Sequence, residues 1–173
     1  MNGAMAAPGR YFEDFTVGLA FRSPRAIRVT AERIKSFAAE FDPQPSHVDE
    51  DTARGSLFGE LVASGWHTAA VAMRLIVDSD LGLSGQGAGV AIESMRLPRP
   101  VRPGDELRVE GAVTEVRPSR SQADRGVVKF QALVYNQRDE VVLEAALELH
   151  AAVSRRSTMT TCVPSSTSSS RWL

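Results

Sequence analysis

The chain has 173 residues, of which 43% are hydrophobic and 24% charged, a composition ordinary for a soluble globular protein. Its 20 basic and 21 acidic residues leave a formal charge of -1, which disfavours a nucleic-acid binder because such proteins normally carry a basic excess. The single cysteine, Cys162, excludes an internal disulfide and a cysteine-built zinc site.

No stretch of the sequence predicts a membrane span or an export signal. The most apolar stretch, residues 61–77, is short for a bilayer span and carries His67 and Arg74. Residues 1–10 lack the basic start and the long apolar centre of a signal peptide. We therefore expect no membrane partner and a cytoplasmic location, which a lone cysteine does not contradict.

Length and composition predict one domain with two loose ends. At roughly 150 residues per domain the chain holds a single domain, which we place at residues 11–155. Residues 1–10 are small and polar, and we expect a flexible N-terminus there. Residues 156–173 are rich in Ser and Thr, and we expect this tail to be disordered because it buries too little surface to offset the entropy of ordering.

Helical patterns come first along the domain. Thr30 is a suitable N-cap for a helix over residues 31–41, whose apolar residues recur on one face. Two prolines shortly after it end that helix, because proline disfavours helical geometry in the residue before it. A short helix is expected at about residues 49–55. Residues 65–78 are apolar on nearly all sides, which predicts a long buried helix.

From about residue 87 the pattern changes to strands. Four runs are expected, over residues 88–97, 105–117, 127–136 and 141–153, with one more strand at about residues 19–29. Alternation places Leu107, Val109, Gly111, Val113 and Glu115 on one face of the second run. The order of elements predicts an α+β fold in which an antiparallel sheet wraps a long central α-helix. Apolar residues on both faces of the strands indicate that a second copy covers the outer face, so we expect a homodimer.

The residues best suited to chemistry lie between the two predicted helices. Asp42 and His47 flank a stretch that two prolines stiffen, and on an extended, turned loop their side chains converge. Gly65 begins the buried helix, where an unpaired backbone N–H can stabilise an oxyanion. The alternatives are that Asp42 is a turn residue and His47 a surface histidine. His67, inside an apolar helix, fits a core or pocket-wall position better than a catalytic one.

Two other clusters favour structure over chemistry. The acidic run at residues 49–51 fits a solvated helix start, because no histidine accompanies it at a familiar metal-ligand spacing, so no metal site is predicted. The glycine-rich residues 81–89 lack the strand before and the helix after that a dinucleotide site requires, and we interpret them as a mobile connection.

The candidate segment resembles the signature of the MaoC-like dehydratases, the group of (R)-specific enoyl-CoA hydratases. That signature runs aspartate, any residue, asparagine, proline, any residue, histidine, five residues and a small residue. Here it reads Asp42, Pro43, Gln44, Pro45, Ser46, His47, VDEDT and Ala53. The Ser64-Gly65 step and the PGD of residues 103–105 also resemble the family. The chain departs from it at Gln44, where asparagine is usual, and at Ser64, which replaces a frequent histidine.

The resemblance implies a hot-dog fold, a dimer, and acyl thioesters that enter near the subunit interface. It implies a lyase that reversibly hydrates a trans-2-enoyl-CoA to the (R)-3-hydroxyacyl-CoA, with no cofactor beyond the coenzyme A of the substrate. Asp42 is then the base, His47 orients the water and shuttles its proton, and the Gly65 amide is the oxyanion donor. We expect Ser64, Trp66 and His67 to contact the substrate.

Two further functions stay open from the sequence. Hot-dog thioesterases tend to place their carboxylate on the central helix, but residues 65–77 contain none. A non-catalytic protein that binds acyl thioesters is also possible, since a fold alone does not imply activity. The acyl chain length, the carrier (coenzyme A or acyl carrier protein) and the physiological direction are not determined by these residues.

Overall fold

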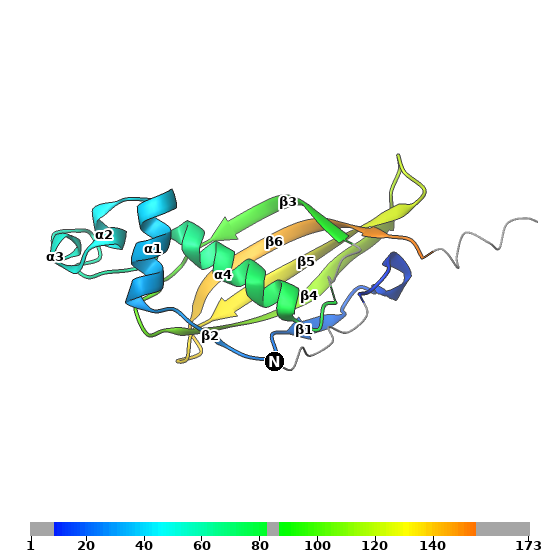
Figure 1. Cartoon of the computed structure of the whole chain (residues 1–173). Coiled ribbons are helices and arrows are strands. Elements are labelled where there is room, and N and C mark those ends of the chain that lie inside the picture. Colours follow the sequence, from blue (N-terminus) through cyan, green and yellow to red (C-terminus); the bar gives the residue numbers. More distant parts are fainter. Residues whose placement is uncertain (1–8, 83–86, 155–173) are drawn as a thin grey trace, which may run out of the picture.

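The computed structural model describes residues 9–82 and 87–154 (Figure 1). The expected loose ends, apart from residues 9 and 10, lie outside the described residues, as does the centre of the glycine-rich connection. The elements, in chain order, are the 3-10 helix η1 (Phe12–Asp14), β1 (Ala20–Arg22), β2 (Ile27–Arg28), α1 (Ala31–Phe41), α2 (Pro45–Val48), α3 (Glu50–Ala53), α4 (Gly65–Asp78), β3 (Gly87–Arg96), β4 (Glu106–Pro118), β5 (Arg125–Tyr135) and β6 (Val141–Ala152).

The strands form one antiparallel sheet in the order β1-β4-β5-β6-β3, and β2 pairs with β4. Figure 1 shows α4 lying across one face of this curved sheet, with α1, α2 and α3 grouped at one end. The predicted α+β fold with a sheet around a central helix is therefore confirmed. The strand expected at residues 19–29 is instead the two short strands β1 and β2. The glycine-rich stretch also differs, because Leu81 is buried and β3 begins at Gly87.

Helix α4 has the predicted bounds but only one buried face. Its buried residues recur three or four apart and pack on the inner side of the sheet: His67, Thr68, Val71, Ala72, Leu75 and Ile76. Burying each large aliphatic side chain stabilises the fold by about 1.5–3 kcal/mol. The opposite face carries the exposed Trp66, Met73 and Val77. The prediction of burial on nearly all sides is wrong for that face.

Helix α1 ends where the prolines predict, and the chain then turns into two short helices. Thr30 caps α1 by accepting a hydrogen bond from the Arg33 amide at 3.3 Å. Pro45 is the first residue of α2, a position where its missing N–H costs nothing. The segment with His47 is thus a helical turn, whereas the sequence predicted an extended loop. The next helix, α3, is shorter than the expected 49–55.

The outer face of the sheet is charged. A register shift in β4 pairs Val113 with Phe130 but Glu115 with Lys129, so Glu115 leaves the inner face that alternation predicted for it. Lys129 pairs with Glu93, and also with Glu115 at 3.7 Å and Glu148 at 3.6 Å. The sequence expected this face to be apolar and covered by a second copy; these four residues are charged instead, and the homodimer stays a prediction. Within residues 9–82 and 87–154, no helix is long and apolar enough to cross a bilayer.

Candidate active site

The Asp42 carboxylate lies where the end of α1 meets the start of α4. Asp42 is the C-cap of α1, and its backbone N–H donates to the Ala38 carbonyl at 2.9 Å. Its Oδ2 accepts a hydrogen bond from the Ser64 hydroxyl at 2.5 Å, and its Oδ1 accepts one from the Gln44 amide at 2.8 Å. Both carboxylate oxygens therefore have a neutral donor.

His47 faces that carboxylate from α2. Its side chain is buried, and its Nε2 lies 3.8 Å from Asp42 Oδ2. On the other side of the ring, Nδ1 lies 2.8 Å from the Val62 carbonyl oxygen. A carbonyl only accepts, so Nδ1 carries the proton of the neutral ring and Nε2 presents its lone pair toward Asp42. A separation of 3.8 Å is too long for a direct hydrogen bond but suits a shared water.

The surroundings of Asp42 favour its ionised form. The Ser64 hydroxyl and then the Gln44 amide lower the pKa of Asp42 below its usual value, and burial opposes them. When the His47 ring is protonated, its positive charge lowers the pKa of Asp42 further. Asp42 is therefore a carboxylate at neutral pH and accepts hydrogen bonds without giving one.

The start of α4 carries Gly65, the residue expected from the sequence to be the oxyanion donor. Ser64 is the N-cap, 1% exposed, and its hydroxyl oxygen accepts from the Trp66 amide at 3.2 Å. Gly65 follows as the first residue of the helix, and among the described residues its N–H has no backbone acceptor. A Cβ at Gly65 would lie 2.6 Å from Leu97 Cδ1. The glycine therefore allows β3 and its following residue to approach the helix start closely.

Trp66 and His67 are not brought together with Asp42 and His47. The Trp66 side chain is 61% exposed. The His67 ring is buried and stacks on Phe37, with ring centroids 4.8 Å apart. Its Nδ1 has no hydrogen-bond partner among the described residues, and burial, followed by the charge of Arg33, lowers the pKa of His67. The His67 side chain therefore packs between α1 and α4, where its surroundings favour the neutral ring. The substrate contacts expected for Trp66 and His67 stay predictions.

Sequence reasoning missed two contributors to the site. Gln44 entered only as a departure from the usual asparagine, although its place two residues after Asp42 puts its amide within reach of the carboxylate. Val62 holds His47 through a backbone carbonyl, a contact that no side-chain pattern signals. No cluster of three or more His, Cys, Asp or Glu side chains in the described ranges could hold a metal ion.

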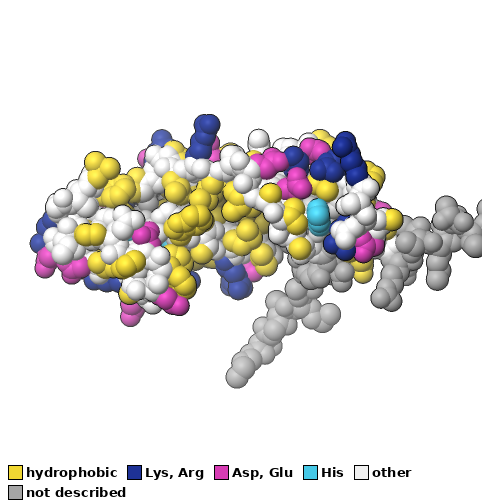
Figure 2. Space-filling model, turned by 90° about the horizontal axis from the view of Figure 1, so that it is seen from above, with side chains coloured by type: hydrophobic (Ala, Val, Ile, Leu, Met, Phe, Trp, Pro, Cys, Tyr) yellow, Lys and Arg dark blue, Asp and Glu magenta, His cyan; other side chains and the backbone are white. Residues whose placement is uncertain are grey.

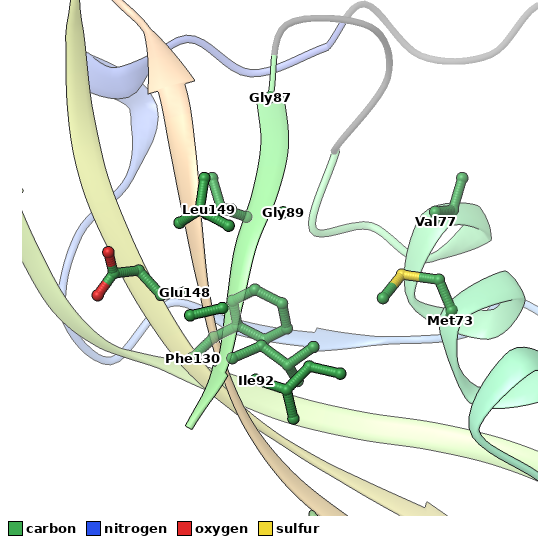
Figure 3. A pocket seen from close by; sticks show the side chains of 11 residues that line it. Met73, Val77, Gly87, Gly89, Ile92, Phe130, Glu148 and Leu149 are labelled. Carbon is green, nitrogen blue, oxygen red and sulfur yellow. The ribbon is translucent and has the colours of Figure 1, made fainter. Parts of the chain in front are cut away.

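An apolar groove opens between α4 and β3, here called the α4–β3 groove. Its volume is about 420 Å³, and it is lined by Met73 and Val77 of α4, residues of β3, Phe130 of β5, and Leu147 and Leu149 of β6. Figure 3 shows Met73 and Val77 facing Ile92 and Leu149 across it. Seen from above, the molecule shows hydrophobic side chains gathered along the middle of this side (Figure 2).

Comparison with known proteins identifies the family of the chain. The model of a family described as the MaoC like domain matches residues 14–154. The chain belongs to the MaoC-like dehydratase family. A crystal structure of a MaoC-like dehydratase from Rhodospirillum rubrum is 49% identical, with a TM-score of 0.78 over 84% of this chain and 99% of that one. The fold is therefore the hot-dog fold.

Two relatives of this MaoC-like dehydratase have names that describe an activity. A 3-hydroxybutyryl-CoA dehydratase of Methylorubrum extorquens is 32% identical over 137 residues, which cover 78% of this chain and 79% of the relative. The structure of the R-hydratase PhaJ1 of Pseudomonas aeruginosa is 26% identical, with a TM-score of 0.68 over 83% of this chain and 86% of that one. The family and these relatives indicate hydratase or dehydratase chemistry.

Proposed function

We propose that this chain reversibly adds water to a trans-2-enoyl-CoA to give the (R)-3-hydroxyacyl-CoA. The observation that carries the proposal is the pair of Asp42 Oδ2 and His47 Nε2, which face each other across 3.8 Å. The relatives named as a 3-hydroxybutyryl-CoA dehydratase and an R-hydratase support the thioester substrate and the configuration of the product. The reaction needs no cofactor beyond the coenzyme A of the substrate.

The catalytic water lies between the two side chains in this proposal. It donates one hydrogen to Asp42 Oδ2, which the ionised carboxylate accepts, and the other to the lone pair of His47 Nε2. The proton moves to Nε2 as the water oxygen bonds to the β-carbon, because the donors on Asp42 make that carboxylate a weak base. Asp42 then stabilises the imidazolium that forms. The sequence assigned the base to Asp42; the two hydrogen bonds that lower the pKa of Asp42 support the assignment to His47 proposed here.

The electrons of the double bond move onto the thioester oxygen during the addition. The Gly65 N–H at the start of α4 is the proposed donor to that oxyanion, and the positive end of the helix dipole adds to its effect. Removing one such donor typically costs about 3–4 kcal/mol of transition-state stabilisation. The enolate then takes a proton at the α-carbon, which returns the proton that left the water and balances the addition.

We further propose that the enzyme is a homodimer formed through the exposed edge of the sheet. Strand β3 pairs only with β6 among the described strands and has nearly all of its side chains exposed. Val90 and Ile92 of β3 and Met73 and Val77 of α4 are exposed apolar residues on the same side of the molecule. A second copy over this surface would cover the α4–β3 groove. The acyl chain is assigned to that groove, which lies about 12 Å along α4 from Gly65 at 1.5 Å per residue.

The test uses crotonyl-CoA and follows the loss of enoyl-thioester absorbance in wild type, Asp42→Asn and His47→Gln. Both variants should lose about 10²–10⁴-fold in kcat, the contribution typical of acid–base catalysis. Asp51→Asn is the matched control, because Asp51 is exposed on α3 and pairs with Arg54, and its activity should equal that of wild type.

Three outcomes contradict the proposal in different ways. Near-wild-type activity in either site variant removes that side chain from the mechanism. Release of free thiol without hydration supports a thioesterase, although the one carboxylate of α4, Asp78, lies at the helix end and pairs with Arg74. Binding of acyl-CoA esters without turnover supports the non-catalytic alternative.

A further inference from the structure

Each oxygen of the Asp42 carboxylate has its own donor, and the two donors come from different elements. Ser64 begins α4 and donates to Oδ2 at 2.5 Å, whereas Gln44 precedes α2 and donates to Oδ1 at 2.8 Å. Two donors on opposite oxygens restrict the rotation of a carboxylate plane more than one donor does. Oδ2 is also the oxygen that lies 3.8 Å from His47 Nε2. The rotation of the carboxylate therefore decides which atom faces the imidazole.

The backbone that carries Gln44 is well restrained. Its N–H donates to the Asp42 carbonyl at 2.8 Å, and its own carbonyl accepts from the His47 amide at 2.9 Å. Proline on both sides of Gln44 fixes two further backbone angles. The Gln44 side chain thus starts from a fixed point between the two catalytic residues, although Gln44 itself is exposed to solvent.

From this arrangement we infer that Gln44 is a positioning residue: its side-chain amide holds the Asp42 carboxylate so that Oδ2 stays aimed at His47. The inference rests on the proposed hydration reaction. Gln44 touches neither reacting atom in this role and acts through Asp42. Gln44 stands where asparagine is usual in this family, and its amide reaches Oδ1 of Asp42.

Besides Gln44, two other side chains shift the pKa of Asp42, and burial opposes them. His47, from α2, is the titratable neighbour whose charge acts on Asp42, and α4 contributes the neutral Ser64. Both neutral donors favour the carboxylate over the carboxylic acid, which would have to give up one of them. Loss of the Gln44 amide should therefore raise the pKa of Asp42 toward its ordinary value while Ser64 stays in place.

The experiment compares wild type, Gln44→Leu and Gln44→Asn, with Gln131→Leu as a matched control. Gln44→Leu keeps most of the side-chain volume and removes the amide, and Gln44→Asn shortens the reach by one methylene. Gln131 is exposed on β5 and lies outside the site. Two readouts are collected: kcat and KM with crotonyl-CoA at neutral pH, and the titration of the Asp42 carboxyl carbon by NMR in the free protein.

Gln44→Leu should lower kcat by about tenfold, a fraction of the 10²–10⁴-fold that acid–base catalysis contributes, with KM unchanged. The NMR titration of Asp42 should move to higher pH. Gln44→Asn should lie between Gln44→Leu and wild type, and Gln131→Leu should match wild type in both readouts. A purely structural role for Gln44 would lower the melting temperature without moving the Asp42 titration.

The outcomes separate this inference from the proposed function. An active wild type with an unchanged kcat in Gln44→Leu overturns the role of Gln44 in catalysis and leaves the hydratase proposal standing. A wild type that hydrates no enoyl-CoA overturns the hydratase proposal, and the NMR titration alone then decides whether Gln44 holds Asp42. If the Asp42 titration does not move in Gln44→Leu, the inference that Gln44 holds Asp42 is wrong, whether or not the wild type is active.

Discussion

At the scale of single residues, neutral groups form hydrogen bonds to the titratable side chains of the site. Ser64 and Gln44 donate to Asp42, and the Val62 carbonyl accepts from His47. Hydrogen bonds to a charged group contribute more than those between neutral groups, about 1.5–3 kcal/mol each. The ionised Asp42 should therefore stabilise the fold as well as take part in the chemistry.

The lowered pKa of Asp42 predicts the pH range of this stabilisation. A carboxyl group whose folded pKa lies below its ordinary value of 3.8 contributes stability above that value, and the contribution is lost as pH falls through the folded pKa. Asp42→Asn should thus unfold more easily than wild type at pH 7. The difference in the free energy of unfolding should shrink below pH 4.

Urea denaturation of wild type and Asp42→Asn at pH 7, 5 and 3 measures this difference directly. The same pair in a Ser64→Ala background is the control, because Ser64 is the largest cause of the lowered pKa. The pH dependence should be weaker in that background. A difference that stays constant from pH 7 to pH 3 would mean that the charge of Asp42 does not stabilise the fold.

At the scale of elements, local signals were enough for the two main helices and for the four long strands. Thr30 caps α1, Ser64 caps α4, and apolar periodicity runs between these caps and the helix ends. Helix α2 was missed although Pro45 is a common first helical residue, since a four-residue helix shows no periodicity. The register shift in β4 and the exposed side of α4 depend on neighbouring strands, and no local pattern encodes them.

Two glycines in the sheet are predicted to differ in their tolerance of a side chain. A Cβ at Gly111 would lie 2.3 Å from both the Gln131 carbonyl oxygen and Phe21 Cζ, and the carbonyl belongs to β5. A Cβ at Gly126 would lie 2.0–2.5 Å from the Phe12 ring, which sits on the short η1. We expect Gly111→Ala to cost about 2–3 kcal/mol and Gly126→Ala about 1 kcal/mol in the free energy of unfolding.

Chemical denaturation of these variants in matched backgrounds tests the difference. Phe12→Ala should remove much of the cost of Gly126→Ala, because the three atoms nearest to the added Cβ all belong to the Phe12 ring. Phe21→Ala should leave much of the cost of Gly111→Ala, because the Gln131 carbonyl remains. Equal costs for the two glycines, or full rescue of Gly111→Ala by Phe21→Ala, would show that the backbone of β5 yields more easily than expected.

At the scale of the whole molecule, the two faces and the two edges of the sheet differ in polarity. The outer face carries Lys129 and its three glutamates, which keep it hydrated. The β3 edge presents unpaired backbone groups beside exposed apolar side chains, and such an edge readily pairs with another strand. The sequence indicated more apolar residues than one core would bury. Only the structure shows that the exposed ones lie on β3 and α4.

The dimer proposal predicts the effect of a charge on this edge. Ile92, 55% exposed on β3, lies in the proposed interface, and Ile92→Lys should give a monomer of 18.7 kDa. Gln131→Lys adds the same charge to the outer face and should leave the dimer intact. Light scattering after size-exclusion chromatography measures both masses. A monomeric wild type, or a dimer that Gln131→Lys breaks and Ile92→Lys does not, would contradict the proposed interface.

The segment between Asp42 and Ser64 has one more consequence. These two residues bracket an excursion of the chain, and their side chains touch at 2.5 Å, so the excursion leaves and re-enters the scaffold at almost one point. Its tip is exposed, with Leu57 at 96%. The excursion also supplies Ala53, Leu61 and Ala63 to the hydrophobic core, so we expect insertions to be tolerated at its exposed tip and not at these positions. Changes of length at the tip can then accumulate without displacing Asp42 or Ser64, which close the excursion at its base.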